Sequence, residues 1–306
     1  MTTAHAVRAA HVRLFRSLHT PSAPLALANA WDAASARVVE AAGAPAVATT
    51  SAGVAWALGS VDGDTLDRDR ALAALAQVTA AVTVPVTADL EDGYGAGPAE
   101  VGATVTRALA AGVAGINLED GTRIPADFAA RLTAARTAAD KAGTDLFLNA
   151  RIDTYLLGLG APEHRLTETL TRAHHYVAAG ADGIFVPGVT DPATISALAA
   201  EIPVPLNVMA GPGAPSVAEL GRLGVARVSL GSGVAQAAYG WRGGRRGVAG
   251  RGDVRRPGGR GAVSGDAGAA GRAVGGAGEG QAGSPLILRC NSHKERKSPG
   301  VRVRSA

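Results

Sequence analysis

Short apolar runs alternate with stretches of helical composition along about 230 residues, and this alternation limits the fold more than any other feature. The eight runs span residues 25–29, 46–50, 84–89, 115–119, 146–150, 183–186, 205–208 and 226–230. The helical stretches between them span residues 33–42, 68–81, 99–111, 126–142, 166–179, 191–200 and 216–223. Four of these stretches end in Ala-Gly, as expected where glycine follows a helix, with the glycines at positions 43, 112, 143 and 180.

The pattern predicts a (β/α)8 barrel, and a doubly wound open sheet is the alternative. Eight units fit the roughly 250 residues that such barrels usually have. No Gly-x-Gly-x-x-Gly motif follows the first run, which counts against a dinucleotide-binding open sheet. We therefore expect the barrel.

Composition limits the kind of core and the kinds of site that the protein can have. Hydrophobic residues make up 47% of the chain and aromatic residues only 4%, so we expect a core of alanine, valine and leucine. The single cysteine, Cys290, excludes an internal disulfide framework and a cysteine-rich metal site. No run of eighteen apolar residues and no continuous apolar segment near the N-terminus is present, so we expect a cytoplasmic protein without a membrane partner.

Charge divides the chain into two parts. Residues 1–239 carry 16 Lys and Arg against 22 Asp and Glu, whereas residues 240–306 carry 14 against 4 and are rich in glycine. We expect a catalytic barrel over 1–239, with an incomplete eighth helix, and a low-complexity basic tail over 240–306 that is disordered or results from a reading-frame shift. An RNA-binding Arg-Gly segment is the alternative, but aromatic residues are not interleaved, so we expect no nucleic-acid partner.

Carboxylates follow two of the predicted strands. Asp89 and Glu91 end one apolar run, and Glu119 ends the next. Carboxylate oxygens suit Mg²⁺, with Mn²⁺ as a substitute, whereas zinc would favour His or Cys. The alternative is that these acids only cap the helices that follow them.

In a barrel the carboxyl ends of the strands converge on one face, where residues distant in sequence meet. These ends carry a set of polar residues, which comprises Asn29 with Asp32, Thr50 to Gly53, Asp89, Glu91, Glu119, Asn149, Arg151, Asp153, Asn207, and Ser229 with Gly231. Arg151 faces several acids, as expected if a metal and a guanidinium jointly hold an anionic substrate, although a structural salt bridge would also explain it. Asn207 is a candidate substrate-binding residue.

Several of these segments resemble the isocitrate lyase/phosphoenolpyruvate mutase superfamily over roughly residues 10–239. The matching segments are Asn29 to Arg37, Thr50 to Val54, Leu58 to Asp62, Asp89 to Gly95, Ile116 to Asp120 and Asn149 to Asp153. The resemblance implies a Mg²⁺-dependent barrel that makes or breaks carbon-carbon or carbon-phosphorus bonds in small 2-oxo or 2-hydroxy acids. It also implies C-terminal helices exchanged between subunits, and hence a homo-oligomer if those helices are intact.

The resemblance implies a role for each matching residue. Asp89, Glu91 and Glu119 match acids around Mg²⁺, and Asp62 matches the acid of a neighbouring loop. The Ser-Ala-Gly turn of Ser51, Ala52 and Gly53 matches backbone amides that hold the substrate carboxylate. Arg151 matches a contact to an anionic group of the substrate. We therefore list Arg151, Asp62 and Glu119 as catalytic candidates.

Two departures from the superfamily limit the reaction. The Lys-Lys/Arg-Cys-Gly-His segment of its lyases is replaced by residues 121–127, which contain no Cys and no His. The Phe-x-Glu of the sixth strand is replaced by Phe185-Val-Pro-Gly188. These losses count against methylisocitrate lyase activity and leave the proton donor open.

The remaining site predicts a Mg²⁺-dependent lyase-type enzyme that cleaves a carbon-carbon bond in a small carboxylic acid through an enolate, of methylisocitrate lyase-like or oxaloacetate type. The alternatives are carbon-phosphorus chemistry, like that of phosphoenolpyruvate mutase or phosphonopyruvate hydrolase, and a catalytically degenerate barrel. The expected partner is accordingly a small carboxylic or phosphono acid.

Overall fold

The computed structural model describes residues 3–63 and 65–240. The predicted basic tail lies outside these residues except for Gly240, so its disorder, its origin and the domain boundary stay predictions.

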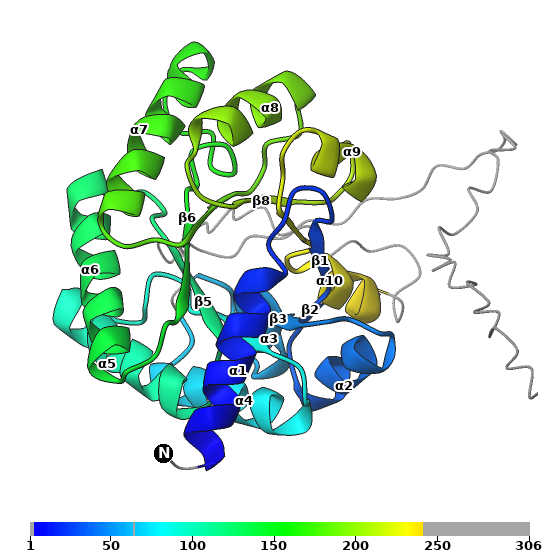
Figure 1. The fold of residues 1–306 in the computed structure, drawn as a ribbon, viewed down its shortest axis with the longest axis vertical. Coiled ribbons are helices and arrows are strands. Elements are labelled where there is room, and N and C mark those ends of the chain that lie inside the picture. The colour runs from blue at the N-terminus through cyan, green and yellow to red at the C-terminus, as the bar shows by residue number, and fades with distance from the viewer. Residues whose placement is uncertain (1–2, 64, 241–306) are drawn as a thin grey trace, which may run out of the picture. The chain divides into compact units, whose positions relative to one another are not determined.

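The described chain forms a ring of parallel strands surrounded by helices (Figure 1). The strands are β1 (Leu25–Leu27), β2 (Asn29–Ala30), β3 (Val47–Thr49), β4 (Val86–Asp89), β5 (Gly115–Glu119), β6 (Phe147–Arg151), β7 (Gly183–Val186), β8 (Leu206–Met209) and β9 (Arg227–Ser229). Each predicted run matches a strand to within two residues, and the first run is divided into β1 and β2 at Ala28.

The division of the first run closes the ring. β1 pairs with the last strand, β9, whereas β2 pairs with β3, and both pairings are parallel. The side chain of Asn29 on β2 bonds to β3 and to the residue after β9, because its Nδ2 donates to the carbonyl of Thr49 at 2.8 Å and its Oδ1 accepts from the amide of Leu230 at 3.1 Å. The predicted (β/α)8 barrel is confirmed, and the open-sheet alternative is wrong.

Helices follow the strands as the alternation predicts. The predicted helices are α2 (Ala33–Ala41), α4 (Arg68–Ala81), α5 (Pro98–Ala110), α6 (Pro125–Lys141), α7 (Arg165–Ala178), α8 (Pro192–Glu201) and α9 (Val217–Arg222). The glycines predicted to follow helices, at positions 43, 112, 143 and 180, all have positive φ angles. Within the described part of the chain, no helix combines the length and the apolar character needed to cross a membrane.

Two further helices and one short 3-10 turn were not predicted, namely α1 (Thr3–Ser17), α3 (Ser51–Ala57) and the 3-10 turn η1 (Pro162–His164). The last helix is α10 (Gly233–Gly240). The segment predicted as a Ser-Ala-Gly turn is instead the first turn of α3. The α10 helix occupies the place of the eighth barrel helix, and the structure describes it as far as Gly240.

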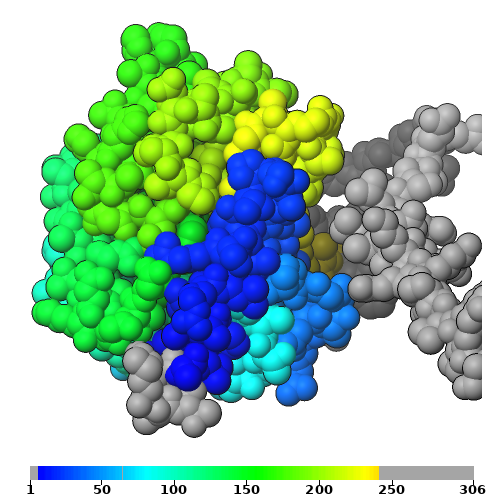
Figure 2. Space-filling model, viewed as in Figure 1, coloured from blue at the N-terminus to red at the C-terminus, as the bar shows by residue number. Residues whose placement is uncertain are grey.

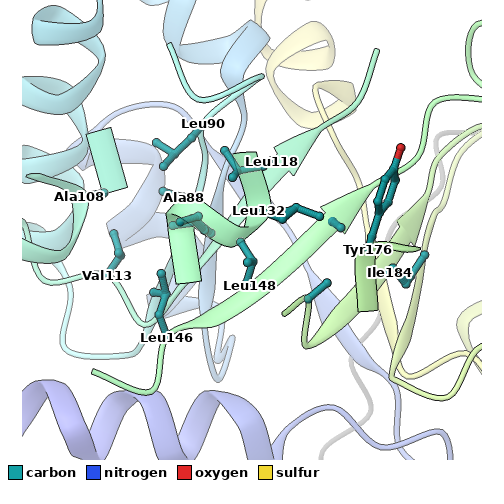
Figure 3. Close-up of a cluster of buried hydrophobic side chains, with 14 of the residues drawn as sticks. Ala88, Leu90, Ala108, Val113, Leu118, Leu132, Leu146, Leu148, Tyr176 and Ile184 are labelled. Carbon is teal, nitrogen blue, oxygen red and sulfur yellow. The ribbon is translucent and has the colours of Figure 1, made fainter. Parts of the chain in front are cut away.

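The main core lies between the strands and the surrounding helices (Figure 3). It consists mostly of alanine, valine and leucine, as the composition predicts, with some isoleucine, and Leu118, Leu132 and Leu148 are almost completely buried. Its aromatic side chains are few, and Phe128 and Tyr176 meet edge to face with ring centroids 4.7 Å apart. Small side chains thus allow the helices to lie close to the sheet.

The α1 helix covers the end of the barrel where the strands begin (Figure 1; Figure 2). Val12 and Phe15 pack against strand-start residues that include Leu25 and Phe147. The ring of Phe15 meets that of Phe147 edge to face, with centroids 5.5 Å apart. Since α1 closes this end, the carboxyl ends of the strands form the open end.

We predict that Phe15→Ala lowers the free energy of unfolding of the full chain by roughly 3 kcal/mol, because it leaves a cavity beneath the barrel. Leu14→Ala on the same helix is the matched control, since 46% of Leu14 is exposed, and it should cost less than about 1 kcal/mol. Urea unfolding followed by circular dichroism measures both effects. Similar losses in the two variants would contradict the role of α1 as a plug.

Candidate active site

Three of the predicted site residues lie at the ends of adjacent strands. Asp89 ends β4, Glu119 ends β5 and Arg151 ends β6, and Glu119 and Arg151 are paired in register. The side chains of Arg151 and Glu119 form an ion pair, and both are largely buried. The barrel therefore brings these residues to one rim, as predicted.

Asp89 connects this rim to the start of α3. Its Oδ2 accepts a hydrogen bond of 3.1 Å from the amide of Ser51, and its own amide donates to Oγ1 of Thr49 at 2.8 Å. Ser51, Ala52 and Gly53 form the buried first turn of α3, and Thr50 places no side-chain cap on it. The first-turn amides of a helix lack partners within the helix, so this turn presents N–H donors beside Asp89.

Gly53 allows this turn to pack closely. A Cβ atom at position 53 would lie 2.7 Å from Cγ2 of Thr50 and 2.9 Å from Cβ of Trp31. A larger residue would therefore displace the turn that lies next to Asp89.

Asp62 approaches the same group from the loop after α3. Its carboxylate accepts a hydrogen bond from the hydroxyl group of Ser51 and is close enough to Asp89 and Arg151 for all three charges to interact. Partial desolvation raises the pKa of Asp62, although the residue is exposed, and the negative charge of Asp89 raises it further against the charge of Arg151. The structure thus brings Asp62 to the predicted site.

Glu91 lies immediately beyond β4 in an unusual backbone conformation. Its φ angle is 51°, in the left-handed region that residues other than glycine rarely occupy, and its side chain is buried. The hydroxyl of Tyr94 donates to Oε1 of Glu91 at 2.9 Å, and the amide of Glu119 donates to the carbonyl of Glu91 at 2.9 Å. Such strain persists where the surrounding contacts impose it, often at functional sites.

Burial and like charges act together on Glu119. Burial raises its pKa to about 8, and the carboxylates of Asp89, Asp153 and Glu91 act in the same direction against the guanidinium of Arg151. The excess of carboxylates at the rim favours a cation in addition to Arg151.

Arg151 is held on two sides. Its Nη1 contacts Glu119, and its Nε donates to Oδ1 of Asp153 at 2.7 Å. Burial alone would lower the pKa of Arg151, but the charges of Glu119, Asp153 and Asp89 outweigh burial and raise it. The guanidinium therefore stays charged.

The sequence Leu-Glu-Asp-Gly occurs twice at this rim, as residues 90–93 and 118–121. In both copies the glutamate belongs to the acid group described above, and the following aspartate is buried behind it against arginines. Arg123 and Arg131 contact Asp92, and Arg172 donates to Asp120 at 2.8 Å. The sequence did not predict these pairings, but the repeated motif was the signal that could have indicated them.

The loop after β5 is tied to the body of the barrel. Arg123 in this loop pairs with Asp92, and the carbonyl of Arg123 accepts from Nη1 of Arg172 at 3.2 Å. The segment that carries a cysteine in the lyases is therefore a short connection before α6.

Below the rim the barrel interior is polar. Asn207, predicted as a substrate contact, is buried here and accepts a hydrogen bond of 3.2 Å from Ser229, and Nδ2 of Asn149 donates to Oδ1 of Asn117 at 3.0 Å. The structure positions Asn207 below the rim and not at its surface, and its role as a substrate contact stays a prediction.

Arg227 is a buried cation in this polar layer. Its Nη2 lies 3.4 Å from Oδ1 of Asn117, and its Nη1 has no hydrogen-bond partner among the described residues. Burial lowers the pKa of Arg227 to about 9, opposed by the charge of Asp89. Sequence reasoning did not single out Arg227, since an arginine inside a strand gives no sign of facing the barrel interior.

Other polar residues have structural roles. Asp32 caps α2 through a bond of 2.7 Å from the amide of Ser35, and Ser216 caps α9. The acids at the ends of β4 and β5 do not occupy the N-cap positions of α5 and α6, which are Gly97 and Ile124.

No group of three or more His, Cys, Asp or Glu side chains is arranged to hold a metal ion within residues 3–63 and 65–240. Magnesium usually keeps several waters and takes only one or two protein carboxylates, so this result is compatible with a magnesium site. The acidic side chains around Asp89 offer only oxygen atoms as metal ligands, and Asp62, Glu91 and Glu119 add negative charge around it. The residues present therefore fit Mg²⁺ by their chemistry.

Comparison with known proteins identifies relatives of this chain. An uncharacterized protein of Mycobacterium tuberculosis (strain CDC 1551 / Oshkosh) is 41% identical over 218 residues, which are 71% of this chain and 81% of that protein. The solved structure of a proposed phosphonomutase from Burkholderia cenocepacia J2315 has 48% sequence identity and a TM-score of 0.72, and the match covers 75% of this chain and 96% of that one.

A further relative has an assigned activity. The oxaloacetate decarboxylase of Ectopseudomonas mendocina (strain ymp) is 36% identical over 158 residues, and the match spans 49% of this chain and about half, 53%, of the decarboxylase. The sequence profile of phosphoenolpyruvate phosphomutase matches residues 15–244. This match covers most of the chain and includes the whole rim described above, so the chain belongs to the phosphoenolpyruvate phosphomutase family, within the isocitrate lyase/PEP mutase superfamily of enzymes.

Proposed function

We propose that the protein is a Mg²⁺-dependent lyase that cleaves a carbon-carbon bond in a small 2-oxo or 2-hydroxy carboxylic acid, with oxaloacetate decarboxylation as the best-supported reaction. The observation that carries this proposal is the grouping of Asp89, Glu119 and Arg151 at one rim, beside a loop without Cys or His. The similarity to oxaloacetate decarboxylase over about half of that enzyme adds support.

Asp89 would hold the ion directly, and Asp62, Glu91 and Glu119 would support it through water or by their charge. When bound, Mg²⁺ would stabilise the negative charge that develops on the substrate oxygen as the bond breaks. Mn²⁺ has similar ligand preferences and should substitute for it.

The substrate carboxylate would be held by a cation and by backbone amides. A guanidinium has five N–H donors, and the contacts of Arg151 with Glu119 and Asp153 leave other donors for an anion. The amides of Ala52 and Gly53 in the uncapped first turn of α3 are further donors beside Asp89. Because these groups are fixed before the substrate arrives, little reorganisation accompanies the reaction.

The reaction would begin with cleavage of the bond between C3 and C4 of oxaloacetate. Carbon dioxide leaves, and the electron pair of that bond passes to the C2 carbonyl, which gives the enolate of pyruvate. A proton added at C3 completes the product, and this proton can come from water. A loop cysteine is therefore not required for decarboxylation, in contrast to cleavage that releases a second organic acid.

Carbon-phosphorus chemistry is the second candidate, since the protein with 48% identity is a proposed phosphonomutase. A degenerate barrel without activity is the third. Assembly into a homo-oligomer and a cytoplasmic location stay predictions.

We predict that the full chain with Mg²⁺ converts oxaloacetate to pyruvate faster than Mg²⁺ alone, and that it leaves isocitrate and methylisocitrate intact because the loop thiol is missing. Coupled detection of pyruvate, glyoxylate and phosphate follows the cleavage and hydrolysis of these substrates and of phosphonopyruvate, and ³¹P NMR follows the interconversion of phosphonopyruvate and phosphoenolpyruvate. Turnover of phosphonopyruvate or phosphoenolpyruvate without turnover of oxaloacetate would instead favour the carbon-phosphorus alternative.

We predict that Asp89→Asn reduces Mg²⁺-dependent turnover at least about 100-fold, because the direct charge on the ion is lost. The far-ultraviolet circular dichroism should not change. Asp140→Asn, which alters an exposed aspartate on α6, is the matched control and should keep full activity. Normal turnover by Asp89→Asn would contradict the proposal that Asp89 holds the Mg²⁺ ion.

We predict that the metal-free chain loses stability as the pH rises from about 4.5 to about 8. The pKa of Glu119 is about 8 in the folded state against an ordinary value of 4.5, so the folded state binds more protons in this range and deprotonation favours unfolding. Melting temperatures measured in EDTA across this range test the effect, and Glu119→Gln should flatten the dependence. An unchanged slope in that variant would contradict the assignment to Glu119.

A further inference from the structure

We propose that Tyr176 and Arg172 on α7 are positioning residues that hold the catalytic guanidinium of Arg151 in place through Asp120 and Asp153. These four supporting residues, Asp120, Asp153, Arg172 and Tyr176, are called the Asp120 network below. The inference rests on the proposed function in that it takes Arg151 as the group that contacts the anionic substrate.

Asp120 is the centre of the network. It is completely buried, and its Oδ2 accepts from Nη1 of Arg172 at 2.8 Å and from the hydroxyl of Tyr176 at 2.9 Å. Its Oδ1 accepts from the amide of Asp153 at 2.9 Å. Both carboxylate oxygens are therefore fixed by protein donors, and the carboxylate has a defined orientation.

Asp120 forms two hydrogen bonds with the backbone at the end of β6. Its carboxylate holds the amide of Asp153, and its own amide donates to the carbonyl of Arg151 at 3.1 Å. The backbone on both sides of Ile152 is thus tied to the loop after β5. A shift of Asp120 would move the backbone that carries Arg151.

Asp153 transmits this position to the guanidinium. The residue is 1% exposed, and its Oδ1 accepts from Nε of Arg151 at 2.7 Å. Since the amide of the same residue is held by Asp120, the carboxylate that orients Arg151 is itself anchored to α7. A displacement of about 1 Å at a substrate-binding group can lower a rate about 100-fold.

The α7 helix is built to support this rim. Its buried residues Thr169, Arg172, Ala173 and Tyr176 recur at helical spacing, and Thr169 is hydrogen-bonded to Thr154 at 2.6 Å. The helix therefore contacts the segment after β6 as well as Asp120.

A merely structural role would not require these polar groups. Tyr176 already packs its ring against Phe128, and a phenylalanine would fill the same space. Buried ionic groups can often be replaced by apolar residues of similar volume without loss of stability. These polar groups connect to the guanidinium of Arg151 through Asp120 and Asp153, which points to the orientation of Arg151 as their purpose.

The experiment compares Tyr176→Phe with Tyr155→Phe, which removes a hydroxyl outside the Asp120 network. Isothermal titration of oxalate, a planar mimic of the enolate, with Mg²⁺ present measures the affinity of the site. Tyr176→Phe should weaken oxalate binding by roughly 10-fold, within the range for partners that orient active-site groups. Tyr155→Phe should change it by less than about 2-fold.

A double-mutant cycle separates positioning from general structure. In an Arg151→Lys background, Tyr176→Phe should change oxalate affinity by less than about 2-fold, because the guanidinium that it positions is absent. A structural role would give the same factor in both backgrounds, and that result would overturn the inference.

A second measurement does not depend on ligand binding. In chain labelled with ¹⁵N-arginine, solvent exchange of the Arg151 Nε–H should be roughly 10-fold faster in Tyr176→Phe than in the unaltered chain, and unchanged in Tyr155→Phe. If Tyr176→Phe does not fold, Arg172→Lys, which keeps the charge beside Asp120, takes its place in both measurements. Equal exchange rates would overturn the inference.

The two proposals fail in different ways. If the unaltered chain binds no oxalate with Mg²⁺ and turns over no substrate, the proposed function is wrong, and the exchange measurement still decides whether the Asp120 network positions Arg151. If the unaltered chain binds oxalate but Tyr176→Phe binds it equally well, only the inference about α7 is wrong.

Discussion

Repulsion among carboxylates at one rim of the barrel is the interaction on which the site depends. A closed ring of parallel strands directs all its carboxyl ends to one face, so Asp89 and Glu119 are brought together although thirty residues separate them. Burial raises the pKa of Glu119, and the negative charges of Asp89, Asp153 and Glu91 raise it further. A proton on Glu119 or a nearby positive charge can balance such a group, and Arg151 and Arg227 supply part of the positive charge. A divalent cation would supply the rest.

In the repeated Leu-Glu-Asp-Gly motif the glutamate and the aspartate have different roles. In each copy one carboxylate joins the rim, and the next is neutralised behind it by arginines from α6, from α7 or from the loop between β5 and α6. The same arginines tie the loops after β4 and β5 to the helices. The loop after β5 is therefore held against α7 through Asp120 and Arg123.

Much of the fold could be predicted from sequence because its signals are local. Apolar runs, Ala-Gly helix ends and the count of eight units require only neighbouring residues, and they located the strands to within two residues. The grouping of Asp89, Glu119 and Arg151 followed from topology, since all three end their strands. By contrast, α1 stands outside the alternation, and the helical start at Ser51 directly after a strand looked like a turn.

The remaining parts of the site depend on distant contacts. Asp120 finds Arg172 and Tyr176 more than fifty residues further along the chain, and no local pattern specifies that pairing. The interior position of Arg227 and the depth of Asn207 depend on strand register in the closed ring, which the sequence does not give.

The most direct test of this account is a crystal structure of the full chain grown with Mn²⁺ and oxalate, with anomalous data collected for manganese. The account predicts one strong anomalous peak at the rim beside the carboxylate of Asp89, with oxalate between the ion and the guanidinium of Arg151. A manganese peak away from this rim, or oxalate bound without contact to Arg151, would contradict it.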